Sequence, residues 1–286
     1  MKQVSDTNKN RLIESELSIS LDGLNFSYKG STHEVLSGLN LTIKGPQLIS
    51  ILGPNGAGKS TLIHCMNKIL EPTGGTVFIN GYDSKEISIK ELAKISSYVP
   101  YSSADSFPLS VVDTILMGRH PHSKWGSIDE DLKVVERTLE LLKIEDLADS
   151  MFNELSAGQH QKVMLARGFA QEPRILFLDE PTSNLDIKYQ LEITRILRRM
   201  SRENNVLVIM ISHDINIAAK YSDNMIILSN HGIYSVGKPE EVVNEKMLKE
   251  VYDVDCDIIM DKGKPHLVLK DNESFDENDI TSSVSI

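Results

Sequence analysis

The feature that most constrains this chain is a glycine-rich loop that follows directly after an apolar run. Residues 48–52 read Leu-Ile-Ser-Ile-Leu, and residues 53–61 read Gly-Pro-Asn-Gly-Ala-Gly-Lys-Ser-Thr. Glycines allow the backbone N–H groups of such a loop to curl around an anion, and the helix that follows presents its positive end to the same anion. A strand, this loop and a helix start are typical of a phosphate-binding loop, or P-loop. The sequence therefore predicts an ATP or GTP site.

The residue types of the loop each address the charge of a nucleotide. We expect Lys59 to neutralise the outer phosphates and the Ser60 hydroxyl to be a ligand of Mg²⁺. A purely structural glycine-rich turn is the alternative, and the preceding strand makes it improbable. The predicted nucleotide-binding residues of the loop are Gly53, Pro54, Asn55, Gly56, Ala57, Gly58, Lys59, Ser60 and Thr61.

Composition limits what else the chain can do. Its 286 residues are 40% apolar, which is enough for a buried core in about two domains. The formal net charge of −11 argues against nucleic acid as the main partner, because such proteins usually carry a basic face. Five acidic residues and no Lys or Arg fall in residues 271–286, which predicts a disordered tail. The distant Cys65 and Cys256 predict free thiols in a reducing compartment.

Neither end of the chain nor its apolar runs predict a membrane segment. Residues 1–11 are polar and lack the apolar stretch of a secretory signal, so we expect no export. The apolar run at 206–211 is much shorter than the roughly 20 residues that span a bilayer. Any role at a membrane is therefore expected to depend on a partner.

Hydrophobic patterning predicts two kinds of sheet and a helical region. Residues 39–43 alternate apolar and polar side chains and residues 76–81 end at a turn, which predicts a small antiparallel sheet. The continuous apolar runs at 175–178 and 206–211 predict parallel strands that are covered on both faces. Residues 110–171 read as helical, and an apolar stripe is expected to consist of Leu132, Val135, Leu139 and Leu142.

Polar residues follow each of the two buried runs. Asp179 and Glu180 come directly after residues 175–178, at the carboxyl end of a strand, where α/β folds place ligand sites. We expect Asp179 to hold Mg²⁺ through water and Glu180 to orient or deprotonate the attacking water. A solvated acidic turn is the alternative. His213 follows the second run and is expected to hydrogen-bond the γ-phosphate or to hold Glu180, unless it is only structural.

Residues 155–159, Leu-Ser-Ala-Gly-Gln, open a predicted helix with Ser156 as its N-cap. Small residues at a positive helix end can form an anion site, although the pentapeptide alone is also typical of an ordinary capped helix. The anion-binding residues expected here are Ser156, Ala157, Gly158 and Gln159.

In order and spacing, five motifs resemble those of the ATP-binding cassette (ABC) ATPases: residues 53–61, 155–159, 175–180, 183–186 and His213. The resemblance covers roughly residues 17–255. It implies an α/β P-loop fold with a RecA-like core, an antiparallel β-subdomain and a helical insert at about 102–172. Residues 1–16 would be a polar extension, and residues 256–286 a C-terminal extension with the acidic tail.

The resemblance also implies how the motifs work. In that family two cassettes face head to tail, so Ser156 and Gly158 would reach the ATP held by a second copy of the chain. Asp186 would help to couple the two sites. Tyr28 would stack on adenine; a core aromatic at a strand end is the alternative. Cofactors would be ATP and Mg²⁺.

Several shorter sequence segments resemble those of the ATPases of iron-siderophore, haem and cobalamin importers. They lie at residues 97–100, 106–111, 115–122, 171–173 and 187–190. This resemblance implies ATP hydrolysis that drives a separate membrane permease, docked near residues 101–125, at the cytoplasmic face of the membrane. An external substrate-binding protein would take part indirectly. Trp125 would belong to the docking surface or to the core.

One position departs from the family pattern. After Tyr98-Val99-Pro100 the family normally has a Gln near Mg²⁺ and the attacking water, whereas this chain has Tyr101. Ser102, Ser103 or a water molecule would replace that contact, or hydrolysis would be slow.

Two further functions share the motifs. A soluble ABC clamp that acts on DNA or ribosomes is disfavoured, because this chain is acidic and has one cassette and no long coiled coil. A second alternative is that the chain is the ATPase of an ABC exporter. Only the short importer-like segments argue against it.

Overall fold

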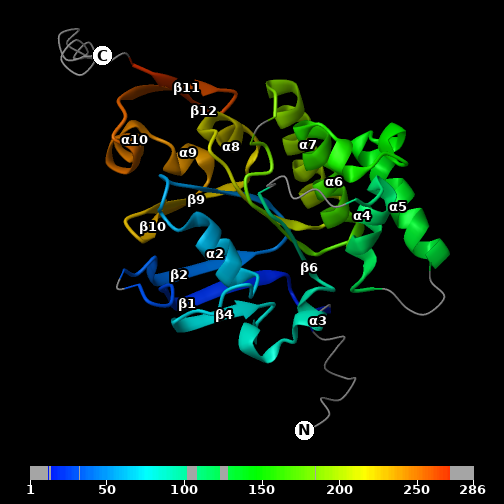
Figure 1. Cartoon of the computed structure of the whole chain (residues 1–286). Coiled ribbons are helices and arrows are strands. Elements are labelled where there is room, and N and C mark those ends of the chain that lie inside the picture. The colour runs from blue at the N-terminus through cyan, green and yellow to red at the C-terminus, as the bar shows by residue number, and fades with distance from the viewer. Residues whose placement is uncertain are drawn as a thin grey trace, which may run out of the picture.

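The computed structural model describes residues 12–270 except residue 13, residue 32, residues 102–107, residues 123–127 and residue 184. Trp125, Ser102, Ser103 and the acidic tail at 271–286 lie outside the described residues. The described part is an α/β structure with two main sheets and a separate two-stranded hairpin (Figure 1).

The larger sheet positions most of the predicted motifs. Its strand order is β10-β9-β3-β8-β7-β6, in which β6, β7, β8, β3 and β9 are parallel and β10 is antiparallel to β9. The two runs predicted as doubly covered parallel strands are β7 and β8, and every residue in both is buried, so that prediction is confirmed. The strands are β3 Leu48–Leu52, β6 Ser96–Val99, β7 Ile175–Leu178, β8 Leu207–Ile211, β9 Asn224–Ser229 and β10 Gly232–Gly237.

The smaller sheet is antiparallel, as predicted, in the order β2-β1-β4-β5. Residues 39–43 fall in β2, and residues 76–79 fall in β4, which ends at a turn. The central strand β1 was not identified from the sequence. The strands are β1 Ser18–Phe26, β2 Leu36–Lys44, β4 Gly74–Ile79 and β5 Tyr82–Asp83.

Helix α2, Lys59–Met66, packs between the two sheets. Its buried Leu62, Ile63 and Met66 belong to one hydrophobic cluster with Ile51 of β3 and Ile19 of β1. Successive side chains of a strand point to opposite faces, so alternate residues of the large sheet contribute to this cluster or to a second one. The helix that follows the P-loop is therefore fixed on both sides by apolar packing.

The opposite face of the large sheet is covered by α7 and by the helices that lie between β6 and β7 in the chain (Figure 1). Buried apolar residues of those helices form the second cluster with Leu176, Leu178, Val208 and Met210 of the sheet. The helices are α4 Val111–Leu116, α5 Ile128–Leu142, α6 Ala157–Ala170 and α7 Ile187–Glu203, with 3-10 turns η2 Met117–Arg119, η3 Glu145–Leu147 and η4 Phe152–Glu154.

The predicted apolar stripe of α5 is wrong at Leu132. That side chain is 40% exposed, whereas Val135, Leu139 and Leu142 are buried as predicted. The buried face of α5 instead begins with Asp131, one residue before Leu132. Asp131 can point inward because its carboxylate pairs with a buried arginine. The spacing of the apolar residues alone did not reveal this, because a polar residue that has a charged partner can occupy the core face of a helix.

The C-terminal part of the described chain packs against the large sheet. Helix α8 and the hairpin strand β12 are joined by Asn216, whose side-chain amide donates to the carbonyl of Leu267 and accepts from its N–H. The elements are α8 Ile215–Tyr221, α9 Pro239–Val242, α10 Glu245–Tyr252, β11 Cys256–Asp261 and β12 Lys264–Leu269, with α3 Ile89–Leu92 and η1 Ser84–Glu86 near the small sheet.

Two smaller predictions concern thiols and membrane segments. Cys65 and Cys256 are free and buried, as predicted, and burial raises the pKa of the Cys65 thiol to about 12. Within the described ranges, each helix is too short or too polar to cross a bilayer.

Candidate nucleotide site

The predicted catalytic segments meet at one edge of the large sheet. Strands β3, β8 and β7 are neighbours and parallel, so their carboxyl ends lie side by side. The P-loop follows β3, His213 follows β8, and Asp179 and Glu180 follow β7. Ligand sites of open α/β sheets form at this edge. Sheet order thus brings the P-loop together with residues that lie more than 100 positions later in the chain.

The start of the P-loop depends on glycine. Gly53 has a φ of 150°, and a side chain there would collide with the carbonyl oxygen of Leu228 on β9. The backbone of the loop can therefore pass close to the neighbouring strand only with glycine. At the other end of the loop, helix α2 begins at Lys59 and directs its free N–H groups toward the loop.

Lys59 is buried against the loop it follows. Its ammonium group donates to the carbonyl oxygens of Gly53 and Pro54, each at 2.9 Å. Burial lowers the pKa of Lys59, and the nearby carboxylates of Glu180 and Asp179 oppose that change. A cation kept in place inside the loop can contact phosphate oxygens without a large change of position.

Ser60 and Asp179 form a pair of hard oxygen donors. The Ser60 hydroxyl donates to Asp179 Oδ1 at 3.2 Å, although 119 residues separate them. Burial raises the pKa of Asp179, while the hydrogen bond from Ser60 lowers it. No cluster of three or more His, Cys, Asp or Glu suited to a metal occurs among the described residues. One hydroxyl and one carboxylate suit Mg²⁺, which keeps waters and binds substrate phosphates for its other ligands.

Glu180 and His213 are in direct contact. The imidazole Nε2 of His213 lies 2.5 Å from Glu180 Oε1, and both side chains are partly exposed at the sheet edge. The backbone of Glu180 is left-handed, with φ 49°, and its carbonyl accepts hydrogen bonds from the N–H and hydroxyl of Ser183. Because this turn and His213 both restrain Glu180, its carboxylate has a defined direction.

Tyr28 lies near the helix end of the P-loop. Its hydroxyl is 3.2 Å from the hydroxyl of Thr61, and its ring meets Phe26 edge to face. The side chain is 49% exposed, which rules out the alternative of a core aromatic. An exposed ring beside the P-loop is available for stacking, so the prediction for adenine stays open.

Helix α6 begins as predicted, with Ser156 as its N-cap. The hydroxyl of Ser156 accepts from the N–H of Gln159, and the side chain of Gln159 accepts from the N–H of Ser156, a reciprocal capping box. Among described residues, no hydrogen bond or ion pair joins Ser156, Ala157, Gly158 or Gln159 to the P-loop of the same chain. Within one chain these residues therefore form a separate surface.

Asp186 has a structural role that the sequence did not indicate. It is the N-cap of α7, and its carboxylate accepts from the N–H of Tyr189 at 2.9 Å. The residue follows the turn that contains Glu180 and Ser183 in the chain.

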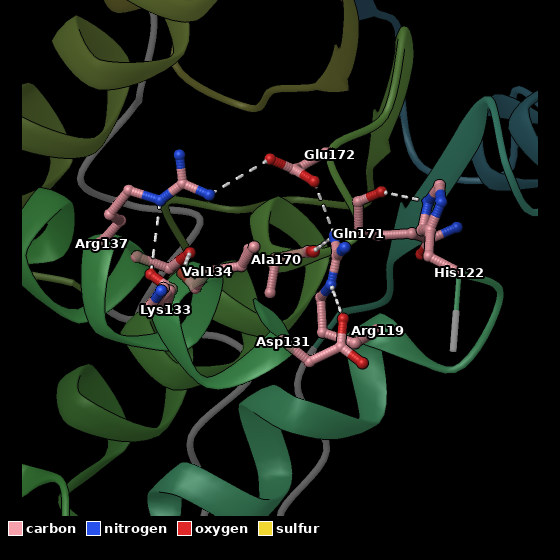
Figure 2. A network of polar contacts seen from close by, with 10 residues as sticks. Arg119, His122, Asp131, Lys133, Val134, Arg137, Ala170, Gln171 and Glu172 are labelled. Carbon is pink, nitrogen blue, oxygen red and sulfur yellow. Dashed lines mark hydrogen bonds and ion pairs between the residues drawn. The ribbon is translucent and has the colours of Figure 1, made fainter. Parts of the chain in front are cut away.

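The segment around 108–122 is attached firmly to α6. Gly118 lies so close that a side chain would collide with the carbonyl oxygen of Arg167 on α6. Buried Arg119 donates to the Asp131 carboxylate, the carbonyl of Ala170 and the Glu172 carboxylate at 2.7–2.9 Å (Figure 2). This network joins η2, α5 and the end of α6, and no sequence pattern indicated its pairing.

Sequence reasoning also missed side chains that support the site from outside the motifs. Tyr98 on β6 and His64 on α2 contact each other near Asp179, and Tyr252 at the end of α10 lies close to the backbone of Gly53. The sequence indicated Tyr98 only as part of the string Tyr98-Val99-Pro100.

Comparison with known proteins agrees with this site. The sequence matches the ABC transporter family over residues 36–183. An uncharacterized ABC transporter ATP-binding protein of Methanocaldococcus jannaschii is 44% identical over 87% of this chain and 97% of its own length. The hemin import ATP-binding protein HmuV of Escherichia coli O157:H7 is 36% identical over 88% of this chain and 99% of its own length.

A solved structure shows the same architecture. It is an ATP-binding cassette, a dimer in a post-hydrolysis state with ADP and Pi, and it is 28% identical with a TM-score of 0.70. The match covers 77% of this chain and 98% of that cassette. With the P-loop, Asp179, Glu180 and His213 at one sheet edge, the chain belongs to the ABC transporter family as an ATP-binding subunit that hydrolyses ATP.

Proposed function

We propose that two copies of this chain close head to tail on two ATP molecules and drive a separate membrane permease that imports an iron-siderophore, haem or cobalamin-type chelate. The observation that carries the proposal is the set of Lys59, Ser60, Asp179 and Glu180 at one sheet edge, with Ser156 and Gly158 on a separate surface of the same chain. One chain then supplies half of each site.

In this mechanism Lys59 binds the outer phosphates, and Ser60 and Asp179 hold Mg²⁺, which neutralises phosphate charge when it is bound. Glu180, oriented by His213, accepts a proton from the attacking water. Contacts across the dimer depend on the γ-phosphate, so hydrolysis releases them and allows the permease to change the side it faces.

The proposal for the cargo is supported by the short strings at 97–100 and 115–122 and by the likeness to a hemin import protein. Cargo selection is assigned to the permease and to an external binding protein. The ATPase would stay at the cytoplasmic face of the membrane, attached through the permease. We assign the ATPase domain to residues 17–255 and an extension to residues 256–286.

Exposed apolar side chains support a permease-docking surface on the helical insert. Met117 is 55% exposed, and Ile128 and Leu132 lie one turn apart on α5 at 53% and 40%. Large apolar side chains exposed together on a surface are typical of interaction sites. The Arg119 network attaches this surface to α6, which carries Ser156 at its other end.

Co-expression with a candidate permease of a metal-chelate importer tests the assignment. We expect the pair to co-purify from membranes and, in proteoliposomes, to take up a ferric siderophore or hemin with ATP. Leu132→Asp on the docking surface should reduce uptake at least tenfold while nucleotide affinity is kept, because a charge would be buried at the interface. Association with ribosomes or DNA instead, without a membrane protein, would contradict the proposal.

Tyr101 is the position at which this chain departs from the family pattern. It follows β6 and is 46% exposed at the same sheet edge. We expect Tyr101→Gln to change ATP turnover several-fold and nucleotide affinity less than twofold. The reason is that the amide oxygen of Gln can contact Mg²⁺ and the attacking water, whereas the phenol of Tyr101 cannot make that contact. Turnover by phosphate release and affinity by fluorescence titration check this. A changed affinity with unaltered turnover would show that the residue acts on binding.

A further inference from the structure

The C-terminal hairpin of β11 and β12 is attached to helix α8 by a polar side chain that no motif contains. Oδ1 of Asn216, on the first turn of α8, accepts from the N–H of Leu267 on β12 at 2.7 Å. The Nδ2 of Asn216 donates to the carbonyl oxygen of the same residue at 3.2 Å. Because both backbone groups of Leu267 bond to Asn216, α8 lies along the outer edge of β12, where a further strand would otherwise pair (Figure 1).

Apolar packing reinforces this attachment. Ala218 and Ala219 of α8 are fully buried in a third hydrophobic cluster, and Leu267 and Ile258 of the hairpin pack against that cluster. The same cluster contains Leu52, the last residue of β3 before the P-loop. The hairpin is therefore packed against elements that border the nucleotide site.

Helix α8 begins directly after His213. Asp214 is its N-cap, and the carboxylate of Asp214 accepts from the N–H of Ile217 at 2.8 Å. The Ser212 hydroxyl donates to the carbonyl of Asp214 at 3.2 Å, and the Ser212 N–H donates to the carbonyl of Ile51 in the large sheet. The backbone of His213 is thus held by the sheet on one side and by the first turn of α8 on the other.

The direction of the His213 ring depends on that backbone. Its Nε2 lies 2.5 Å from Glu180 Oε1, although the His213 side chain is 48% exposed and is not enclosed by packing. Helix α8 has seven residues, and a helix of that length is not stable without contacts to the rest of the protein. Asn216 supplies such a contact three residues after His213.

We propose that Asn216 is a positioning residue for His213, and that the β11–β12 hairpin thereby belongs functionally to the ATPase site. This role rests on the proposed roles of His213 and Glu180 in hydrolysis. By holding the first turn of α8, Asn216 keeps the imidazole within hydrogen-bond reach of the Glu180 carboxylate. Misplacement of a catalytic group by about 1 Å can cost about 10²-fold in rate, even when the cause lies far from the reacting atoms. Loss of Asn216 therefore lowers turnover and leaves nucleotide binding at the P-loop unchanged.

The test is a double-mutant cycle in the full-length protein, with phosphate release from MgATP as the readout. Asn216→Leu removes both hydrogen bonds to β12 and should lower kcat about tenfold, while the affinity for a fluorescent ATP analogue stays within twofold of wild type. In a His213→Ala background the same substitution should have no further effect, because the effects of residues that act through one another do not add.

Asn40→Leu is the matched control. Asn40 on β2 also accepts from a backbone N–H, that of Gly23, and donates to a backbone carbonyl, that of Gly38, both at 3.0 Å. It lies in the small sheet, so turnover and affinity should stay unchanged. Asn216→Asp keeps the acceptor for the Leu267 N–H, which is the shorter of the two bonds, and should lose less turnover than Asn216→Leu.

The NMR spectrum of the nucleotide-free protein gives a readout that does not depend on activity. The ring signals of His213 should shift in Asn216→Leu and stay unchanged in Asn40→Leu. Unchanged His213 signals in Asn216→Leu, or an equal loss of turnover with and without His213, would overturn the positioning role alone. If His213→Ala hydrolyses ATP at the wild-type rate, the proposed role of His213 in hydrolysis fails first and the role of Asn216 fails with it, so the two failures are distinguished.

Discussion

Glu180→Gln is expected to bind ATP with near wild-type affinity and to hydrolyse it about 10²–10⁴-fold more slowly, the usual contribution of a general base. The amide keeps the size of the side chain and a hydrogen bond to His213, which lies 2.5 Å away in the wild type, but it does not accept a proton from water. Because the γ-phosphate then persists, the variant should accumulate as a closed dimer. Phosphate release and light scattering with MgATP measure both effects.

Glu203→Gln is the control for this substitution. Glu203 ends α7 in an exposed i,i+4 pair with Arg199, a type of interaction worth less than about 1 kcal/mol. Its removal should leave ATPase activity and dimerisation unchanged. Rapid hydrolysis by Glu180→Gln would exclude Glu180 as the base, and a slow but strictly monomeric variant would contradict the head-to-tail dimer.

Lys59→Ala should lose nucleotide affinity by about 10²-fold, which corresponds to about 3 kcal/mol for a charged hydrogen bond to phosphate. Lys59 is the cation buried inside the P-loop, and its ammonium group is already within 2.9 Å of two loop carbonyls. Fluorescence titration with a labelled ATP measures the loss. Circular dichroism should show the fold unchanged.

Lys68→Ala is the matched control, because Lys68 also donates to backbone carbonyls, those of Ser84 and Ile87, at the other end of α2. We expect it to lower thermal stability without changing nucleotide affinity, since Lys68 lies beyond the phosphate-binding end of the helix. Equal losses of affinity in both variants would show that carbonyl pairing, and not phosphate binding, explains the effect of Lys59.

The motifs could be predicted because their chemistry is local. In residues 53–61 the glycines, the lysine and the helix start are consecutive, and the Ser156 cap needs only Gln159 three residues later. Strands β7 and β8 could be recognised because burial on both faces leaves continuous apolar runs. Leu132 was misassigned because the charged partner of Asp131 lies outside its helix.

Contacts between distant segments required the tertiary structure. Tyr98 is one tyrosine among eight, and only the pairing of β6 with β7 places it beside Asp179. The bonds of Arg119 to Asp131 and Ala170 likewise depend on how three helical segments pack. The hairpin of β11 and β12 carried no recognised pattern, because its strands are short and half exposed.

By itself, the amino-acid sequence determined the chemistry of this protein: a loop that can surround phosphate, a lysine to neutralise it, and carboxylates at the end of a buried strand. Such features lie within a few residues of one another, where backbone geometry and hydrogen bonding act directly. The tertiary structure decided which strands are neighbours, and hence that Ser60 meets Asp179 and that His213 meets Glu180. Strand order depends on burial of the whole apolar surface, a property that no short segment contains.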